Sequence, residues 1–202
     1  MTRIKLCGLS RPQDIRAANA LEPELVGFVF APGSRRYVSP REAEGLKKLL
    51  LPTIQAVGVF VNERAETVAR LLNSGIIDLA QLHGTEDGDY IRRLRALTGR
   101  PVIQAFRVAA RRDVLLAENS AADCILLDAG AGTGTVFDWG LLRQIRRPYF
   151  LAGGLGVHNV RKAVEELAPY GVDVSSGIET DGKKDPDKMA AFVAAVRKED
   201  GT

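Results

Sequence analysis

Two side chains that can exchange protons each end a short apolar run. Cys7 closes residues 3–7 and is followed by Gly8, and Asp128 closes residues 123–128. A thiolate can take up a proton as a general base, and a protonated carboxyl group can release one as a general acid. Each residue also has a structural interpretation: an unassisted cysteine is usually a small core side chain, and Asp128 could cap the glycine-rich loop after it. Cys7 and Asp128 are therefore a candidate acid–base pair, and the fold of the rest of the chain decides whether they lie in one site.

Two later stretches are suited to hold an anion. Gly153 and Gly154 follow one apolar run, and Ser175, Ser176 and Gly177 follow the next. Loops of this composition can direct several backbone N–H groups at one phosphate. Glycines that only make tight turns would explain either stretch alone, but the two together favour a phosphate site.

A second anion could bind at Arg36, because a guanidinium holds a carboxylate through two parallel hydrogen bonds. Its neighbour Arg35 is expected to point the other way. His83 could contact a substrate, although a loop histidine bonded to backbone is an equal interpretation. The other histidine, His158, is expected to be an exposed residue in the first turn of a helix.

Strand-like and helix-like segments alternate along the whole chain. Apolar runs predict strands over residues 3–7, 25–30, 54–61, 77–82, 101–106, 123–128, 148–152 and 171–174. Helices are predicted over residues 12–21, 40–51, 63–73, 87–97, 111–118, 139–145, 157–168 and 186–198, and Ser39 is expected to be the N-cap residue of the second.

This alternation belongs to the α/β class and predicts a single (β/α)₈ TIM barrel formed by residues 1–202 as one domain. An open, doubly wound sheet is the structural alternative. That arrangement would need edge strands, which are usually shorter or more polar than the strands predicted here.

A closed barrel would bring the candidate residues to one rim, since active sites of such barrels lie at the carboxyl ends of the strands. Cys7 and Asp128 would then project into the mouth from opposite walls, and the phosphate stretches would follow strands seven and eight. Lys5 shares a strand face with Cys7 and would meet Asp173 where the first and last strands pair. We expect these two charges to form an ion pair, because an unpaired charge inside the barrel would be costly. Cys124 begins its strand at the opposite end and is expected in the core.

Composition restricts the possible partners and compartments. A chain of 202 residues with 46% hydrophobic residues can bury a full core, and no run approaches the roughly 18 apolar residues of a membrane span. The start of the chain lacks the apolar stretch of a signal peptide, so a cytoplasmic protein is expected. Two cysteines far apart in sequence predict free thiols and no metal site. The net charge of +3 is dispersed, which favours a small phosphorylated substrate over nucleic acid.

Taken in order, the rim motifs resemble those of the phosphoribosylanthranilate isomerases, (β/α)₈ enzymes of tryptophan biosynthesis. The resemblance covers nearly the whole chain, and the ordered set is far more specific than any single motif. The matching stretches are residues 5–9 (KLCGL), 34–38 (SRRYV), 81–84 (QLHG), 127–128 (LD), 132–134 (GTG), 137–139 (FDW), 151–155 (LAGGL), 173–179 (DVSSGIE) and 182–185 (GKKD).

The resemblance implies an Amadori rearrangement, which converts an aminoaldose phosphate into an aminoketose. It implies that Cys7 is the general base, that Asp128 is the general acid and that Arg36 holds the anthranilate carboxylate. No metal or organic cofactor is expected for this chemistry. It further implies that the loops with Gly153, Gly154, Ser175, Ser176 and Gly177 hold the phosphate, while His83 stays a candidate for substrate contact from its position alone.

One departure and two alternatives accompany this interpretation. Family members often have a lysine after Gly-Thr-Gly, where this chain has Thr135. A related phosphate-binding barrel is one alternative, such as an indole-glycerol-phosphate enzyme or a histidine-pathway isomerase, although the latter would be expected to use two carboxylates rather than Cys7 and Asp128. A catalytically silent barrel that binds a phosphorylated metabolite is the other. The helical exterior suits a monomer or a homodimer.

Overall fold

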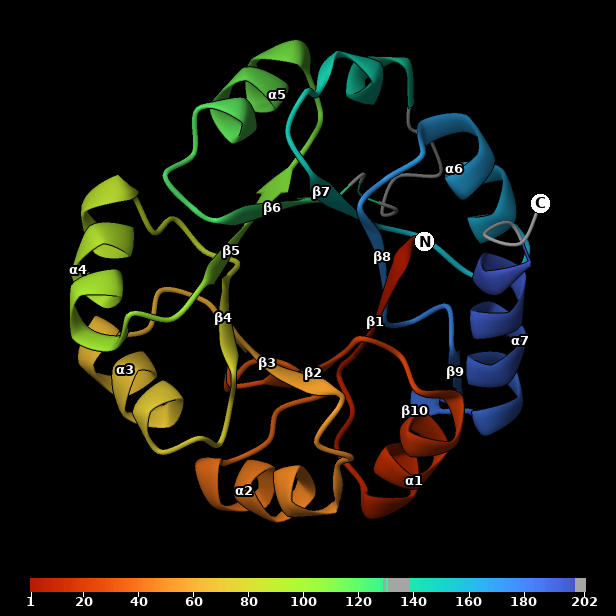
Figure 1. The fold of residues 1–202 in the computed structure, drawn as a ribbon, viewed down its shortest axis with the longest axis horizontal. Coiled ribbons are helices and arrows are strands. Elements are labelled where there is room, and N and C mark those ends of the chain that lie inside the picture. Colours follow the sequence, from red (N-terminus) through yellow and green to blue (C-terminus); the bar gives the residue numbers. More distant parts are fainter. Residues whose placement is uncertain (129, 131–138, 199–202) are drawn as a thin grey trace.

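Eight parallel strands form a closed ring at the centre of the molecule, and helices surround it (Figure 1). The structure is a computed structural model that describes residues 1–128, 130 and 139–198. Each strand pairs with its neighbours in chain order, and β1 pairs with β8 to close the ring, which confirms the predicted (β/α)₈ barrel. The strands are β1 (Arg3–Cys7), β2 (Leu25–Val29), β3 (Gln55–Phe60), β4 (Leu79–Leu82), β5 (Val102–Arg107), β6 (Cys124–Asp128), β7 (Tyr149–Ala152) and β8 (Gly171–Val174).

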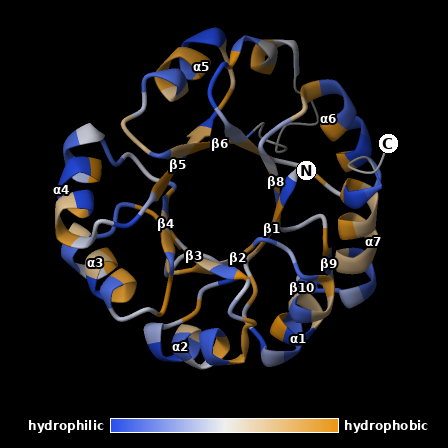
Figure 2. Cartoon of the chain, viewed as in Figure 1, coloured by the Kyte–Doolittle hydropathy of each residue, from blue (hydrophilic) through white to orange (hydrophobic). Residues whose placement is uncertain are grey.

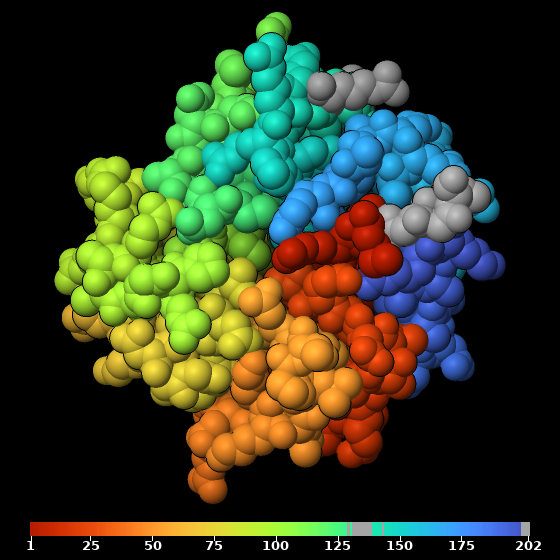
Figure 3. Space-filling model, viewed as in Figure 1, coloured from red at the N-terminus to blue at the C-terminus, as the bar shows by residue number. Residues whose placement is uncertain are grey.

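The helices pack their apolar sides on the outside of the ring and present hydrophilic residues outward (Figure 2). The first and last parts of the chain meet, because α7 contacts both β1 and α1, as the red and blue atoms in Figure 3 show. The α-helices are α1 (Pro12–Leu21), α2 (Pro40–Leu49), α3 (Ala65–Asn73), α4 (Gly88–Thr98), α5 (Arg111–Glu118), α6 (Val160–Leu167) and α7 (Pro186–Arg197).

Local sequence explains where the helices begin. The hydroxyl of Ser39 accepts a hydrogen bond from the backbone N–H of Glu42, and the Glu42 carboxylate accepts one from the backbone N–H of Ser39. This reciprocal cap, followed by Pro40, confirms the predicted start of α2. The last helix begins in a similar way, because the Asp185 side chain accepts from the N–H groups of Asp187 and Lys188.

Two segments differ in kind from the sequence-based prediction, and α6 begins at Val160, so His158 is exposed as predicted but precedes the helix rather than lying in its first turn. The helix predicted over residues 139–145 is a 3₁₀-helix, η1 (Trp139–Gln144), so the described residues contain seven α-helices rather than eight. A six-residue segment with a glycine in its first turn gains little from α-helical hydrogen bonding, and short segments of this kind often adopt 3₁₀ geometry. A hairpin between β8 and α7 was not predicted, and its strands are β9 (Glu179–Thr180) and β10 (Lys183–Lys184).

Side chains inside the ring form a small core of their own. Its apolar members come from β2, β3, β5, β6 and β7, and Cys124 packs against them only half-buried. Where β1 meets β8 the interior is charged: Lys5 lies beside Asp173 in the strand register, and its Nζ is 2.8 Å from the Asp173 Oδ1. Lys5 is fully buried and Asp173 is largely so, and the predicted ion pair is confirmed inside the barrel.

The ion pair keeps Lys5 charged. Burial alone lowers the pKa of Lys5, but the Asp173 carboxylate and, after it, Cys7 together more than offset this effect, so the net pKa is raised. The pair is therefore a matched unit in which either charge alone would be poorly solvated.

Removing one partner of this pair should destabilise the fold strongly. Lys5→Met should lower the free energy of unfolding by roughly 3–5 kcal/mol, because Asp173 is left without a counter-charge. Lys5→Met combined with Asp173→Leu should recover much of that loss, since no isolated charge remains. Urea denaturation followed by circular dichroism measures both effects.

Lys48→Met is the matched control, because Lys48 pairs with Glu44 on the exposed face of α2. We expect it to change the free energy of unfolding by less than about 1 kcal/mol. A Lys5→Met variant as stable as this control would contradict the importance of the buried pair.

Candidate active site

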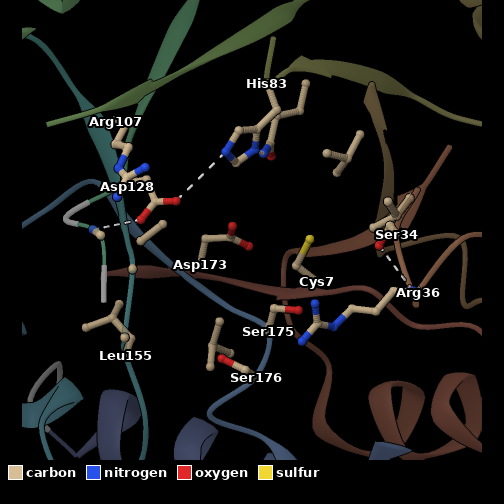
Figure 4. A pocket seen from close by; sticks show the side chains of 18 residues that line it. Cys7, Ser34, Arg36, His83, Arg107, Asp128, Leu155, Asp173, Ser175 and Ser176 are labelled. Carbon is tan, nitrogen blue, oxygen red and sulfur yellow. Dashed lines mark hydrogen bonds and ion pairs between the residues drawn. The ribbon is translucent and has the colours of Figure 1, made fainter. Parts of the chain in front are cut away.

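A cavity of about 640 Å³ opens at the carboxyl ends of the barrel strands (Figure 4). Gly177, predicted as part of the site, does not line this cavity but packs behind it. The other predicted site residues all line it, and they are Cys7, Arg36, His83, Asp128, Gly153, Gly154, Ser175 and Ser176.

Cys7 is the last residue of β1, and its thiol faces the cavity (Figure 4). The neighbouring strand makes room for the sulfur, because a Cβ atom at Gly27 would lie only 2.7 Å from Sγ. The side chain is 7% exposed, and its burial raises the pKa of Cys7. The Lys5 ammonium lowers this pKa and the Asp173 carboxylate raises it, so the net pKa stays above the ordinary thiol value.

Asp128 lies on the opposite side of the cavity from Cys7, with Asp173 between them on the floor (Figure 4). One carboxylate oxygen, Oδ1, accepts a hydrogen bond of 2.9 Å from the backbone N–H of Gly130. The other, Oδ2, points toward His83, whose Nε2 is 3.8 Å away. Asp128 is therefore both the loop cap and the cavity carboxylate that the sequence left as alternatives.

His83 is held by Gln81 on the same strand end. The Gln81 Nε2 and the His83 Nδ1 are 3.2 Å apart, and Gln81 is almost fully buried. The Gln81 Oε1 is buried without a hydrogen-bond partner within the described part of the chain. The His83 ring therefore lines the cavity and contacts another side chain rather than backbone. This position favours the interpretation that His83 could contact a substrate.

Arg36 reaches into the cavity with one side of its guanidinium already occupied. Its Nε donates to the Glu179 Oε1 over 2.6 Å, and its Nη2 donates to Oε2 over 2.9 Å. Arg35 donates to the same carboxylate, its Nη2 lying 2.7 Å from Oε2, so the expectation that Arg35 points the other way is wrong. Gly8 allows the Arg36 side chain to pass close to the backbone, because a Cβ atom at Gly8 would lie 2.4 Å from the Arg36 Cδ. The φ of Gly8, +77°, also favours glycine at this position.

Sequence reasoning missed the roles of Glu179 and Lys184, which the β9–β10 hairpin places beside the cavity. The Lys184 Nζ donates to the Glu179 Oε1 over 2.7 Å and to the Ser175 carbonyl over 2.9 Å. Burial by itself raises the pKa of Glu179, but hydrogen bonds from Arg36 and Lys184 bring it down to about 2. Asp181-Gly182 is the signal that could have predicted the hairpin, since Asp-Gly favours the positive φ angles of a two-residue turn.

The loops after β7 and β8 form the wall beneath Arg36 and Asp128. Gly153 and Gly154 have φ angles of +90° and +64°, which L side chains rarely adopt. Gly177 lies against the other loop so closely that a Cβ atom would be 2.0 Å from the Leu155 carbonyl oxygen. Among the described residues, no acceptor binds the N–H groups of Gly154 and Ser176. The two loops therefore touch and leave backbone donors for an anion.

Some predicted features lie outside the described residues, namely Gly132, Gly134 and Thr135. Within the described residues, no group of three or more His, Cys, Asp or Glu side chains could hold a metal ion. No helix in that same part of the chain is long and apolar enough to cross a membrane.

Comparison with known proteins agrees with this geometry. Residues 4–195 match the model of the family described as N-(5′-phosphoribosyl)anthranilate (PRA) isomerase. The N-(5′-phosphoribosyl)anthranilate isomerase of Acetivibrio thermocellus is 44% identical, and the alignment covers 100% of this chain and 98% of the relative. The crystal structure of phosphoribosyl anthranilate isomerase from Thermotoga maritima superposes with a TM-score of 0.90 at 36% identity and covers 98% of this chain and 100% of that one. A phosphoribosyl anthranilate isomerase in complex with reduced 1-(o-carboxyphenylamino)-1-deoxyribulose 5-phosphate superposes with a TM-score of 0.88 at 37% identity, with 98% and 100% coverage.

The raised pKa of Cys7 can be tested by alkylation. In a Cys124→Ser variant, which leaves Cys7 as the single thiol, the rate of reaction with iodoacetamide should rise with pH through a midpoint above the ordinary thiol pKa. The thiolate is the reacting species, and burial favours the neutral thiol. The same variant unfolded in urea is the control, and its midpoint should return to the ordinary value. A folded midpoint at or below that value would show that Lys5 outweighs burial.

Proposed function

The chain belongs to the N-(5′-phosphoribosyl)anthranilate isomerase family, and we propose that Cys7 and Asp128 are the general base and general acid of its reaction. The chain is thus an isomerase of tryptophan biosynthesis. The observation that carries the residue assignment is the position of the two groups: they face one cavity from opposite walls, between loops that can hold a phosphate and an arginine that can hold a carboxylate.

The reaction begins with opening of the ribose ring. Asp128, as the general acid, delivers a proton to the ring oxygen while the bond from that oxygen to C1′ breaks. The nitrogen lone pair forms the C1′ iminium at the same time. Asp128 is suited to this step because one of its oxygens is fixed by the Gly130 N–H and the other faces the open cavity.

The second step removes a proton from carbon. The thiolate of Cys7 takes the C2′ proton, and the electrons of the C2′–H bond neutralise the iminium to give an enolamine. Tautomerisation of the enolamine then breaks the O–H bond of the C2′ hydroxyl and forms a C–H bond at C1′, which gives the ketone at C2′. Electrons move only within the substrate, so the isomerisation balances without an oxidant or reductant.

The thiolate is a minor form before substrate binds. A thiol with an ordinary pKa is only roughly 3% ionised at pH 7, and burial raises the pKa of Cys7 further. The Lys5 ammonium lies near enough to stabilise the thiolate, but Asp173 offsets much of its charge. The base step should therefore accelerate as the pH rises toward the pKa of Cys7.

The two ends of the substrate are assigned by charge and donor geometry. The backbone N–H groups of Gly154 and Ser176 are available to a phosphate, and the loops that carry them adjoin through Gly177. Arg36 is assigned to the anthranilate carboxylate, and His83 to a contact with the substrate on the wall of Asp128.

We also propose that residues 1–202 act as one catalytic domain. Pairing of β1 with β8 closes the barrel, so segments from both ends of the chain are needed for the cavity. A cytoplasmic site of action is supported by the two free cysteines, which a reducing compartment would preserve.

Turnover of phosphoribosylanthranilate, followed by the loss of its fluorescence, tests these assignments. The wild-type protein should convert it, and Cys7→Ser and Asp128→Asn should each lower kcat/KM roughly a hundred- to ten-thousandfold, the usual loss of a general acid or base. Cys124→Ser is the matched control, because that thiol lies at the far end of the barrel and should leave kcat/KM unchanged.

Near-normal kcat in both active-site variants would show that the assigned roles are wrong. A wild-type protein that binds the product tightly but converts no substrate would instead support a catalytically silent, metabolite-binding barrel.

A further inference from the structure

The β9–β10 hairpin carries two buried charges that the acid–base mechanism does not use. Glu179 is 9% exposed and Lys184 is 5% exposed, although each β-strand of the hairpin has only two residues. A buried charge is costly unless it is paired, so both residues need a reason to be at this position. Their contacts lead to the two predicted anion sites.

Glu179 occupies one edge of the Arg36 guanidinium. Both of its carboxylate oxygens accept from Arg36, one from Nε and one from Nη2, in the side-on geometry of a bidentate pair. A guanidinium has five N–H donors in a rigid plane, so the Nη1 group and the remaining Nη2 hydrogen form a second edge. Because Arg36 also lines the main cavity, this second edge is available to a ligand there.

Lys184 joins this arrangement to the loop after β8. One ammonium group donates to the Glu179 Oε1 over 2.7 Å, to the Ser175 carbonyl over 2.9 Å and to the Ser175 Oγ over 3.3 Å. Glu179 and Lys184 thus form a continuous chain of charge-assisted hydrogen bonds from Arg36 to Ser175. Both ends of that chain line the main cavity.

The local charge balance favours a further anion. Three cations, from Arg35, Arg36 and Lys184, contact the single carboxylate of Glu179. Together these four side chains therefore carry an excess of positive charge beside the cavity. A carboxylate on the free edge of Arg36 would reduce that excess.

We propose that Glu179 and Lys184 are positioning residues that hold Arg36 at a fixed separation from the Ser175 loop, so that the carboxylate and phosphate ends of one substrate are bound together. This inference rests on the proposed role of Arg36 as the carboxylate ligand. Glu179 sets the plane of the guanidinium, and Lys184 sets its distance from the phosphate end. Neither residue touches the reacting atoms.

The binding of two ligands distinguishes a loss of Arg36 positioning from general damage to the binding site. The first is the reduced product, a carboxyphenylamino-deoxyribitol phosphate, and the second is its phenylamino analogue, which lacks only the carboxylate. Calorimetry measures the binding of each ligand to the Glu179→Gln variant. The carboxylated ligand should bind roughly ten- to a hundredfold more weakly than to the wild type, which is the range expected for one lost charge-assisted contact. The Kd of the analogue should stay within about twofold of wild type. In turnover, KM should rise by a similar factor while kcat changes little.

Lys184→Met should weaken both ligands, because it also removes the contact to the Ser175 loop. Two controls lie on the same hairpin: Asp181→Asn at the turn and Lys183→Met on the exposed side of β10. Each makes the matching chemical change at an exposed residue, and both should leave the two Kd values unchanged. Glu179→Asp, which keeps the charge but shortens the side chain, should fall between wild type and Glu179→Gln, and it replaces Glu179→Gln if that variant does not fold.

An equal loss for both ligands in Glu179→Gln, or no loss for either, would overturn the positioning role. Arg36→Met distinguishes this outcome from failure of the proposed function. If Arg36→Met loses only the carboxylated ligand and the Glu179 variants do not, the inference about the hairpin fails alone. If Arg36→Met binds both ligands as the wild type does, the assignment of Arg36 fails and the inference fails with it.

Discussion

The seam between β1 and β8 is the constraint on which the rest of the structure depends. Parallel pairing there places Lys5 beside Asp173, and the two charges satisfy each other inside the barrel. Side chains of a strand alternate in direction, so Cys7 and Ser175, each two residues farther along, face the same interior at the rim. A slip of either strand by one residue would turn its two side chains outward and bury the alternate positions of that strand instead. The ion pair thus specifies the register that the active site requires.

The same pair limits the chemistry it helps to position. An ammonium group beneath a thiol would ordinarily favour the thiolate, but Lys5 shares its charge with Asp173, and burial favours the neutral thiol. The fold therefore keeps Cys7 protonated in the ligand-free site. Access of water through the open rim of the cavity opposes this effect of burial on Cys7. A bound substrate would replace that water and change the surroundings of Cys7, Asp128 and Asp173 together.

Much of the fold and part of the site could be predicted from the sequence because they follow from periodicity and strand order. Apolar runs gave the eight strands, and placing their ends at one rim was enough to bring Cys7 and Asp128 to one cavity and to pair Lys5 with Asp173. Contacts between side chains on separate loops could not be predicted from periodicity and strand order. The direction of Arg35 depends on Glu179, which is more than 140 residues away in the chain and reaches the site through a hairpin. The 3₁₀ geometry of η1 was missed for a different reason, since the apolar spacing of so short a segment does not distinguish it from an α-helix.

The hairpin between β8 and α7 is where the chain departs from simple alternation of strand and helix. It adds only four strand residues, yet it supplies the carboxylate that orients Arg36 and the ammonium that reaches Ser175. An antiparallel turn can place Glu179 opposite Lys184, so that both side chains meet on one side of the hairpin. The positively charged end of the cavity is therefore built on a local insertion, while the acid–base pair is built on the barrel itself.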